Sequence, residues 1–173
     1  MMDLLYEFTE WLRTTQLVEL SLWIGETWLS LIIVTNFWTI PTVQTIHILF
    51  LGLAFGAVLM MNLRVMGVVG GHHSLTETSK RYMPWVRWAF LGLLVSGLLL
   101  IIGEPVRELI NPIFWIKMGL IIVAIVAAVL FQRAVAGQTA SSASGGLKLG
   151  AFAIIVLWLA IMAGGRWIAY APV

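Results

Sequence analysis

Residues 42–67 read TVQTIHILFLGLAFGAVLMMNLRVMG, and this stretch predicts the architecture of the chain. Its apolar run is long enough for a helix that crosses the hydrocarbon core of a bilayer, which takes about 20 residues. His47 near its start and Arg64 near its end are its two ionisable residues. Such groups are costly in hydrocarbon and are candidate functional residues for that reason. The stretch therefore predicts a membrane-spanning helix with an imidazole that needs an explanation.

The composition of the chain excludes a protein that faces water on all sides. Of its 173 residues, 61% are hydrophobic and only 10% are charged, whereas soluble domains average about 45–50% apolar and about 25% charged residues. The formal net charge of +2 does not indicate a nucleic-acid partner. The sequence contains no cysteine, which excludes disulfides, thiolate metal sites and cysteine nucleophiles. We therefore expect an integral membrane protein whose main partner is the lipid bilayer.

Four segments are long and apolar enough to span a membrane as helices, which predicts an all-α bundle. They cover residues 41–69, 83–102, 112–132 and 149–170. Proline suits the first turn of a helix, where its missing N–H costs nothing, and Pro41 and Pro112 stand at such positions. Asn111 can cap the helix that Pro112 begins. Gly103 is expected to end the second helix.

The first 40 residues differ in character from the rest. Between residues 3 and 13, apolar and charged side chains fall on opposite faces of a helix, which is typical of a helix in the membrane interface. Residues 16–40 are apolar but include Glu19 and Glu26, and each acid would cost about 2.5–3.5 kcal/mol at mid-bilayer. We therefore favour an interfacial or partly re-entrant segment over a fifth span. The predicted division is amphipathic interfacial helices in 1–40 and a four-helix transmembrane bundle in 41–173.

Loop cations predict how the chain is oriented in the membrane. The 70–82 loop and the 133–148 loop each contain two cationic residues. The positive-inside rule places both loops in the cytoplasm, which leaves the C-terminus in the periplasm. Tryptophans near the predicted helix ends are typical of the aromatic belt at the membrane interface. They are Trp38, Trp85, Trp115 and Trp167.

Ionisable residues of four different segments fall at a similar depth, close to the predicted outer side. His47, Lys117, Arg166 and Glu104 each lie within about two helical turns of the outer end of a segment. Three of them can be cationic, which indicates an anion between them. A b-type haem fits this pattern, because its iron takes a histidine and its propionates take Lys or Arg. The sequence thus predicts His47 as the axial metal ligand, with Lys117 and Arg166 binding the propionates.

Each of these residues also has an ordinary structural explanation, and the sequence leaves both open. The presence of His47 is explained equally well by a structural hydrogen bond to a neighbouring helix and by a role as an iron or copper ligand. Lys117 and Arg166 can snorkel to the outer interface, and Glu104 can pair with one of them. The predicted spans contain no second histidine, so a bis-histidine haem within one subunit is excluded. A sixth ligand would be Lys117, a methionine, water or a residue of a partner subunit.

The remaining polar candidates suit other roles. Arg64 and Arg87 lie near the predicted cytoplasmic helix ends, where they can anchor to lipid head groups. His72 and His73 stand in a polar loop. A helix of about 25 residues separates them from His47 and spans roughly 37 Å, so they cannot share its site. We expect both to be exposed.

Several motifs resemble a family of small bacterial inner-membrane proteins. They are Ile46-His47, Gly56, Leu63-Arg64 and Gly67, the segments MPWVRWAFLGLLVSGLLL (83–100) and NPIFWIKM (111–118), and the terminal AGGRWIAY (163–170). More distantly, the architecture is similar to CopD-type copper-resistance proteins and to the HemJ-type protoporphyrinogen oxidase. The first likeness implies copper handling and the second a haem or porphyrin site. Either implies His47 as the ligand, with Arg64, Lys117 and Arg166 as supporting basic positions.

The sequence therefore predicts a multi-pass inner-membrane protein that binds haem b through His47. Its expected role is electron transfer or a porphyrin-linked redox reaction, with a quinone or a redox protein as partner. The alternatives are a copper or small-solute permease and a non-catalytic structural subunit. Gly52 and Gly56 form a small-xxx-small pair suited to close helix contact. A homo-oligomer or a subunit of a larger complex is expected for so small a chain.

Overall fold

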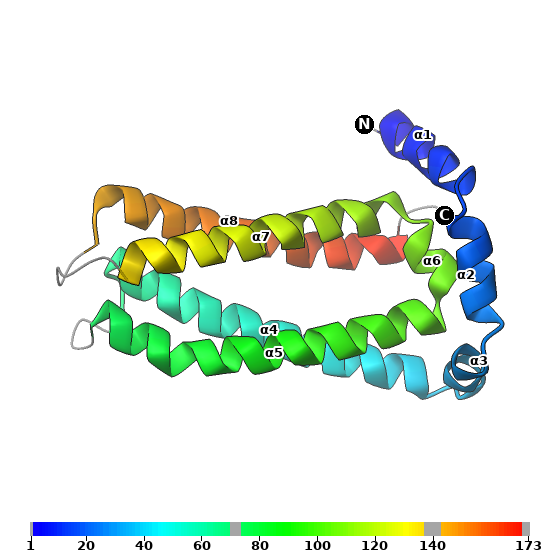
Figure 1. Ribbon diagram of the computed structural model, residues 1–173, viewed down its shortest axis with the longest axis horizontal. Coiled ribbons are helices and arrows are strands. Elements are labelled where there is room, and N and C mark those ends of the chain that lie inside the picture. The colour runs from blue at the N-terminus through cyan, green and yellow to red at the C-terminus, as the bar shows by residue number, and fades with distance from the viewer. Residues whose placement is uncertain (1, 70–73, 137–142, 171–173) are drawn as a thin grey trace. The chain divides into compact units, whose positions relative to one another are not determined.

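The computed structural model describes residues 2–69, 74–136 and 143–170, which are helical and contain no strand. In chain order the helices are α1 (Met2–Arg13), α2 (Leu17–Gly25), α3 (Trp28–Thr35), α4 (Thr39–Met66), α5 (Leu75–Gly103), α6 (Pro105–Leu109), α7 (Pro112–Ala136) and α8 (Gly145–Trp167), followed by the 3-10 turn η1 (Ile168–Tyr170) (Figure 1). His72 and His73, for which an exposed role was predicted, lie outside the described residues.

Helices α4, α5, α7 and α8 are each long and apolar enough to cross a membrane. Their most apolar windows have a mean hydropathy between 2.1 and 2.6, and at most 22% of any window is buried inside the chain. Such apolar and exposed surface would be unstable in water and is suited to lipid. The prediction of an all-α membrane bundle is confirmed.

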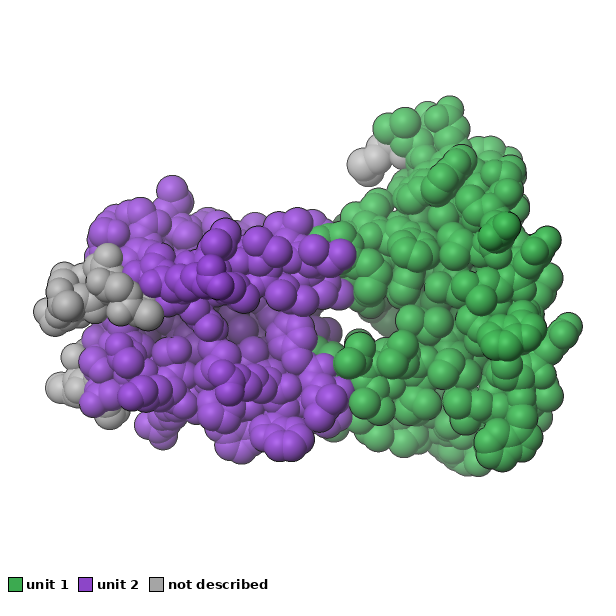
Figure 2. Space-filling model, in the orientation of Figure 1, with its two compact units in different colours: residues 1–49, 93–119, 163–173 green, residues 50–92, 120–162 purple. Residues whose placement is uncertain are grey.

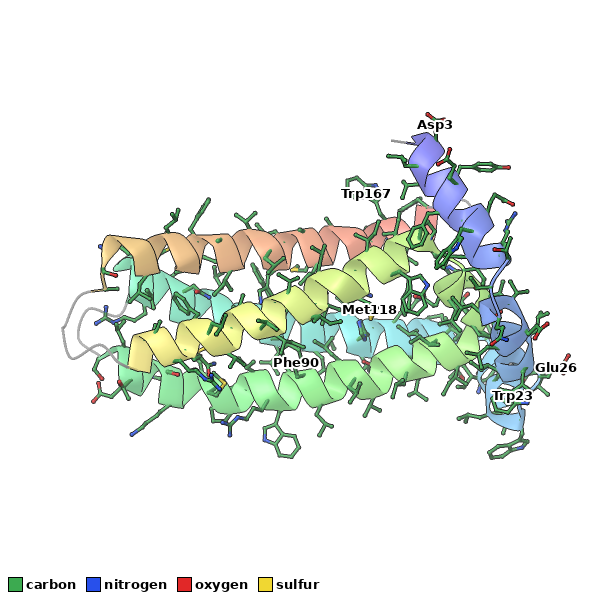
Figure 3. All side chains as sticks on the ribbon, turned by 45° about the horizontal axis from the view of Figure 1, so that its top comes forward. Asp3, Trp23, Glu26, Phe90, Met118 and Trp167 are labelled. Carbon is green, nitrogen blue, oxygen red and sulfur yellow. The ribbon has the colours of Figure 1, made fainter. Side chains whose placement is uncertain are left out.

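Three of the four tryptophans predicted for the membrane interface are exposed. Trp38, Trp85 and Trp167 are exposed by 71%, 56% and 64%, and Figure 3 shows Trp167 projecting away from its helix. Trp115 is half-buried instead, because its indole Nε1 donates a hydrogen bond to the Leu109 carbonyl oxygen at 2.9 Å. Three of the four tryptophans predicted for the aromatic belt therefore have the exposure that a lipid interface requires.

Helix α5 begins earlier than the predicted start at residue 83. Ser74 and Glu77 form a capping box: the Glu77 amide donates to Ser74 Oγ at 3.1 Å, and the Ser74 amide donates to Glu77 Oε2 at 2.8 Å. The helix then continues through Pro84. Most of the predicted 70–82 loop is therefore helical, because the sequence SLTE is a helix start and not a turn.

The N-terminal segment consists of three short helices. The predicted amphipathic helix over residues 3–13 is confirmed as α1, which exposes Leu4 and Trp11 and buries Leu12. Helices α2 and α3 are bent by 67° at their junction, and together they are long and apolar enough to be a broken span or a re-entrant loop. Helix α2 packs against α6. The preference for an interfacial or re-entrant segment over a fifth span stays a prediction.

The chain divides into two compact units that cut across the long helices (Figure 2). Unit 1 comprises residues 1–49, 93–119 and 163–173, and unit 2 comprises residues 50–92 and 120–162. In unit 1, Leu109, Phe114 and Ile168 form a buried cluster. In unit 2, Val65, Leu75, Val135 and Ala151 form another. The predicted division at residue 40 separates interfacial from membrane-spanning segments, which is a different criterion, and it stays a prediction.

Asn111 joins the start of α7 to the end of the chain within unit 1. Its side chain is fully buried, and its Oδ1 accepts a hydrogen bond from the Ile113 amide at 2.9 Å. Its Nδ2 donates to the Ile168 carbonyl oxygen at 3.1 Å. The predicted cap of α7 is confirmed, and the same amide fixes η1 against it.

Glycines permit close helix approach at positions other than the predicted ones. A Cβ atom on Gly52 or Gly56 would meet nothing within 4 Å among the described residues, so these residues make no close helix contact within that part of the chain. A Cβ on Gly92 would lie 2.5 Å from the Phe50 ring, and one on Gly103 would lie 2.5 Å from Ile40. Gly92 and Gly103 are therefore the positions where α5 needs glycine.

Candidate cofactor site around His47

His47 of α4 and Ser96 of α5 form a hydrogen-bonded pair in unit 1. His47 Nδ1 lies 2.8 Å from Ser96 Oγ, and Ser96 is buried. The Ser96 hydroxyl donates to the Leu93 carbonyl oxygen at 3.4 Å, a group that can only accept. In the tautomer in which Nδ1 carries the ring hydrogen, Ser96 Oγ accepts the hydrogen bond from His47 Nδ1 and the lone pair is on Nε2.

The other ring nitrogen of His47 is available to a ligand. Among the residues that the structure describes, Nε2 has no hydrogen-bond partner, and the ring is half-buried. The backbone of α5 passes close beside the ring, since a Cβ on Gly97 would lie 3.5 Å from His47 Cε1. His47 is thus oriented on one side by Ser96 and left open on the other, which is how protein histidines are held when they bind a metal.

Lys117 of α7 supplies a positive charge to the same unit. Its side chain is half-buried and runs along α8, where Cβ atoms on Gly164 and Gly165 would each lie 3.9 Å from it. The ammonium group interacts electrostatically with His47 and with Glu108. Within the described part of the chain it has no hydrogen-bond or ion-pair partner. Lys117 is therefore a cation that lacks a direct anion.

Glu108 of α6 is the carboxylate whose charge acts on Lys117. Burial raises the pKa of Glu108, and the negative charge of Glu104 adds to that effect. The positive charges of Lys117 and Arg107 oppose it and lower the pKa in part. The net result is a carboxyl that holds its proton to higher pH than a solvated glutamate would.

The pKa of Glu108 predicts how stability depends on pH. A carboxyl whose pKa is raised by folding stabilises the fold below its unfolded pKa, and this contribution is lost as the pH rises through the folded pKa. We expect Glu108→Gln to match the wild type at acidic pH and to unfold a few degrees higher at neutral and alkaline pH. Thermal unfolding across pH measures this, with the exposed Glu26→Gln as control. A pH-independent difference between wild type and Glu108→Gln would contradict it.

Glu104 and Arg166 are bound to partners other than those weighed from the sequence. Both carboxylate oxygens of Glu104 accept hydrogen bonds from Arg107, at 2.9 and 2.8 Å. Arg166 donates to the Tyr170 hydroxyl at 2.7 Å and lies 5.1 Å from the centre of that ring. Arg166 is exposed. Glu104 therefore does not pair with Lys117 or Arg166, and its ion pair is local to α6.

Arg64 lies in unit 2, about 25 Å further along α4 than His47 at the usual helical rise. It is buried and lines a cavity of about 230 Å³ together with Arg81 and Tyr82. The structure thus brings His47 and Lys117 into one unit and places Arg64 in the other. The part predicted for Arg64 in cofactor binding stays a prediction.

No cluster of three or more histidine, aspartate or glutamate side chains suited to a metal ion occurs among residues 2–69, 74–136 and 143–170. A metal held by a macrocycle needs only one histidine from the protein, so this finding does not bear on it. Ser96 and Glu108 were the two residues of the site that the sequence did not single out.

The fold and the site define an all-α, multi-pass membrane protein with one histidine oriented among its spanning helices. Residues 8–171 match the family described as Family of unknown function (DUF6644), and the chain belongs to that family. No curated protein and no solved structure matches the chain. The likeness to CopD-type and HemJ-type proteins stays a prediction.

Proposed function

We propose that the protein binds one b-type haem through His47 Nε2 and serves in electron transfer or a porphyrin-linked redox reaction. The observation that carries the proposal is the state of the His47 ring. Ser96 holds Nδ1 at 2.8 Å, and Nε2 has no partner among the described residues. A ring held by a hydrogen bond at one nitrogen, with the other nitrogen unused, is the arrangement in which histidines bind a metal.

The charge of Lys117 supports the same proposal. Its half-buried ammonium has no direct anion in the described part of the chain, and a propionate carboxylate would supply one. Glu108 competes with a propionate for this charge. Because burial raises the pKa of Glu108, its carboxyl is neutral over a wider pH range and repels a propionate less. Arg166 is engaged by Tyr170, so Lys117 is the stronger candidate for this role.

The residues of the chain would each make a distinct contribution. His47 binds the iron, and Ser96 keeps the ring in the tautomer and rotation that present the Nε2 lone pair. Lys117 neutralises a propionate, and the apolar helix faces exclude water. When bound, a b-type haem carries one electron at a time between its ferric and ferrous states.

An absorption spectrum of the purified protein tests the proposal. We expect a Soret band in the oxidised protein and a sharpened α-band after reduction with dithionite, at about one haem per chain. The protein is purified in mild detergent from cells supplied with a haem precursor. A colourless protein from such cells would refute haem binding. A copper or small-solute permease, or a structural subunit, would then become the leading explanation.

The orientation of the chain can be tested because the sequence contains no cysteine. We propose that the 133–148 loop is cytoplasmic and that α6 and the C-terminus are periplasmic in the bacterial inner membrane. A membrane-impermeant maleimide added to intact cells is then expected to label Val106→Cys and not Ser144→Cys. Both positions are exposed, and both should react after lysis. Labelling of Ser144→Cys alone in intact cells would reverse the orientation.

Assembly with other chains remains part of the proposal. An added Cβ on Gly52 or Gly56 meets no described atom of the chain within 4 Å, so this surface of α4 can pack against a second copy or another subunit. An electron-transfer role also requires a redox partner, for which we propose a quinone or a redox protein.

A further inference from the structure

A cavity of about 170 Å³ lies within unit 2, between residues of α4, α5, α7 and α8. Its inner wall is apolar and aromatic and includes Val58, Phe90, Ala124, Ile154 and Trp158. Of these, Val58, Ala124, Ile154 and Trp158 are buried, and Phe90 is labelled in Figure 3. The cavity is separate from the His47 site, whose residues all belong to unit 1.

The dimensions of the cavity suit one aromatic ring. An apolar cavity of about 150 Å³ inside a protein is known to hold a benzene molecule. The walls also carry aromatic side chains in fixed orientations. Phe90 meets Trp158 edge to face, with ring centres 6.0 Å apart and planes at 83°. Phe55, which does not line the cavity, packs against Trp158 with ring centres 6.4 Å apart. A further ring in the cavity could pack against Phe90 and Trp158 in the same manner.

Asn62 adds one polar requirement to this apolar space. Its side chain lines the cavity and is only 3% exposed. Its Nδ2 donates to the Val58 carbonyl oxygen at 2.8 Å, and this contact fixes the amide orientation because a carbonyl can only accept. The buried Asn62 Oδ1 has no hydrogen-bond partner among the described residues. A buried acceptor without a donor is costly, so a ligand with a donor group would be favoured here.

We propose that this cavity binds one hydroxylated aromatic ring, of the phenol or quinol class, whose hydroxyl group donates to Asn62 Oδ1. The ring size follows from the cavity volume, and the hydroxyl follows from the unpaired acceptor. A quinone ring has the same size but no donor, so the site favours the reduced, hydroxylated form. The inference concerns binding alone and does not depend on haem at His47.

A matched pair of small probes tests the proposal. Para-propylphenol carries the hydroxyl donor, and para-propyl fluorobenzene has nearly the same size without it. We expect the wild-type protein in lipid nanodiscs to bind the phenol about tenfold more tightly in equilibrium dialysis. Asn62→Leu is expected to remove this preference. Ala124→Phe fills the cavity, so it measures the background of probe dissolved in lipid. Short-tailed benzoquinol is expected to displace the phenol, and the matching benzoquinone is not.

The wild-type protein decides the test even where a variant fails to fold. Equal binding of the two probes would overturn the proposal and identify the cavity as ordinary space for a lipid chain. Binding of neither probe above the Ala124→Phe background would overturn it as well. Thermal unfolding shows whether Asn62→Leu is folded. A preference for the phenol that persists in folded Asn62→Leu would assign the donor contact elsewhere and refute the role of Asn62.

Discussion

His47→Ala is expected to lose at least nine-tenths of the Soret absorbance per chain that we expect for the wild type, an effect corresponding to about 1.4 kcal/mol or more in haem affinity. The reason is that Nε2 is the nitrogen left open by the Ser96 hydrogen bond. No second histidine is present in the described residues to replace it. The measurement is the Soret absorbance of purified variant and wild type, divided by chain concentration.

Controls on the same two helices separate ligand loss from general damage. Gln44→Ala removes a polar side chain about one turn from His47 on α4 and is expected to keep the spectrum. Ser96→Ala leaves Nε2 in place but removes the group that orients it. Loss of such an orienting contact typically costs about 10–100-fold in affinity for the bound metal, so we expect a weakened and not an abolished band. Added imidazole is expected to restore part of the band in His47→Ala.

If His47 has only a structural role, the expected behaviour of the two variants is different. If His47 only ties α4 to α5, His47→Ala and Ser96→Ala should lower the unfolding temperature equally, and neither protein should be coloured. If the wild type is coloured and His47→Ala keeps its bands, the iron ligand lies elsewhere. Either result would remove His47 from the cofactor site.

The sequence predicted the long helices well because their signals are local. Apolar length alone located α4, α7 and α8 to within a few residues, and Asn111 with Pro112 gave the start of α7 correctly. Apolar length does not locate the start of α5, because that start depends on reciprocal hydrogen bonds between two polar residues, Ser74 and Glu77. Polar residues at a helix start can be capping groups as well as loop residues.

The site was predicted in part, because its contacts join residues far apart in the chain. His47 and Lys117 were identified from their cost in a membrane, and the structure places both in unit 1. Ser96 could not be identified from the sequence, because a single serine in an apolar helix forms no pattern. Its hydrogen bond joins α5 to His47 of α4 and is visible only in the structure. The depth of Arg166 along its helix suggested that it belongs to the site as well. Depth does not determine the direction in which a side chain points. Its side chain turns to Tyr170.

Gly92→Ala is expected to lower the unfolding temperature, although alanine is the better helix former. The added Cβ would lie 2.5 Å from three atoms of the Phe50 ring, a distance that requires Phe50 or the α5 backbone to move. Overpacking of this kind costs about 1–3 kcal/mol, while the change from glycine to alanine in a helix contributes about 1 kcal/mol in the opposite direction. The clash should therefore prevail. Thermal unfolding of the detergent-purified protein measures the result.

The two opposing effects can be separated with Gly119→Ala on α7. A Cβ there meets no described atom within 4 Å, so this variant has the gain in helix propensity without the clash and is expected to be as stable as the wild type or more so. Phe50→Leu should cost less in the Gly92→Ala background than alone, because the smaller side chain relieves the clash. If Gly92→Ala and Gly119→Ala behave alike, α5 does not need glycine to approach Phe50, and the packing of unit 2 at this contact would be wrong.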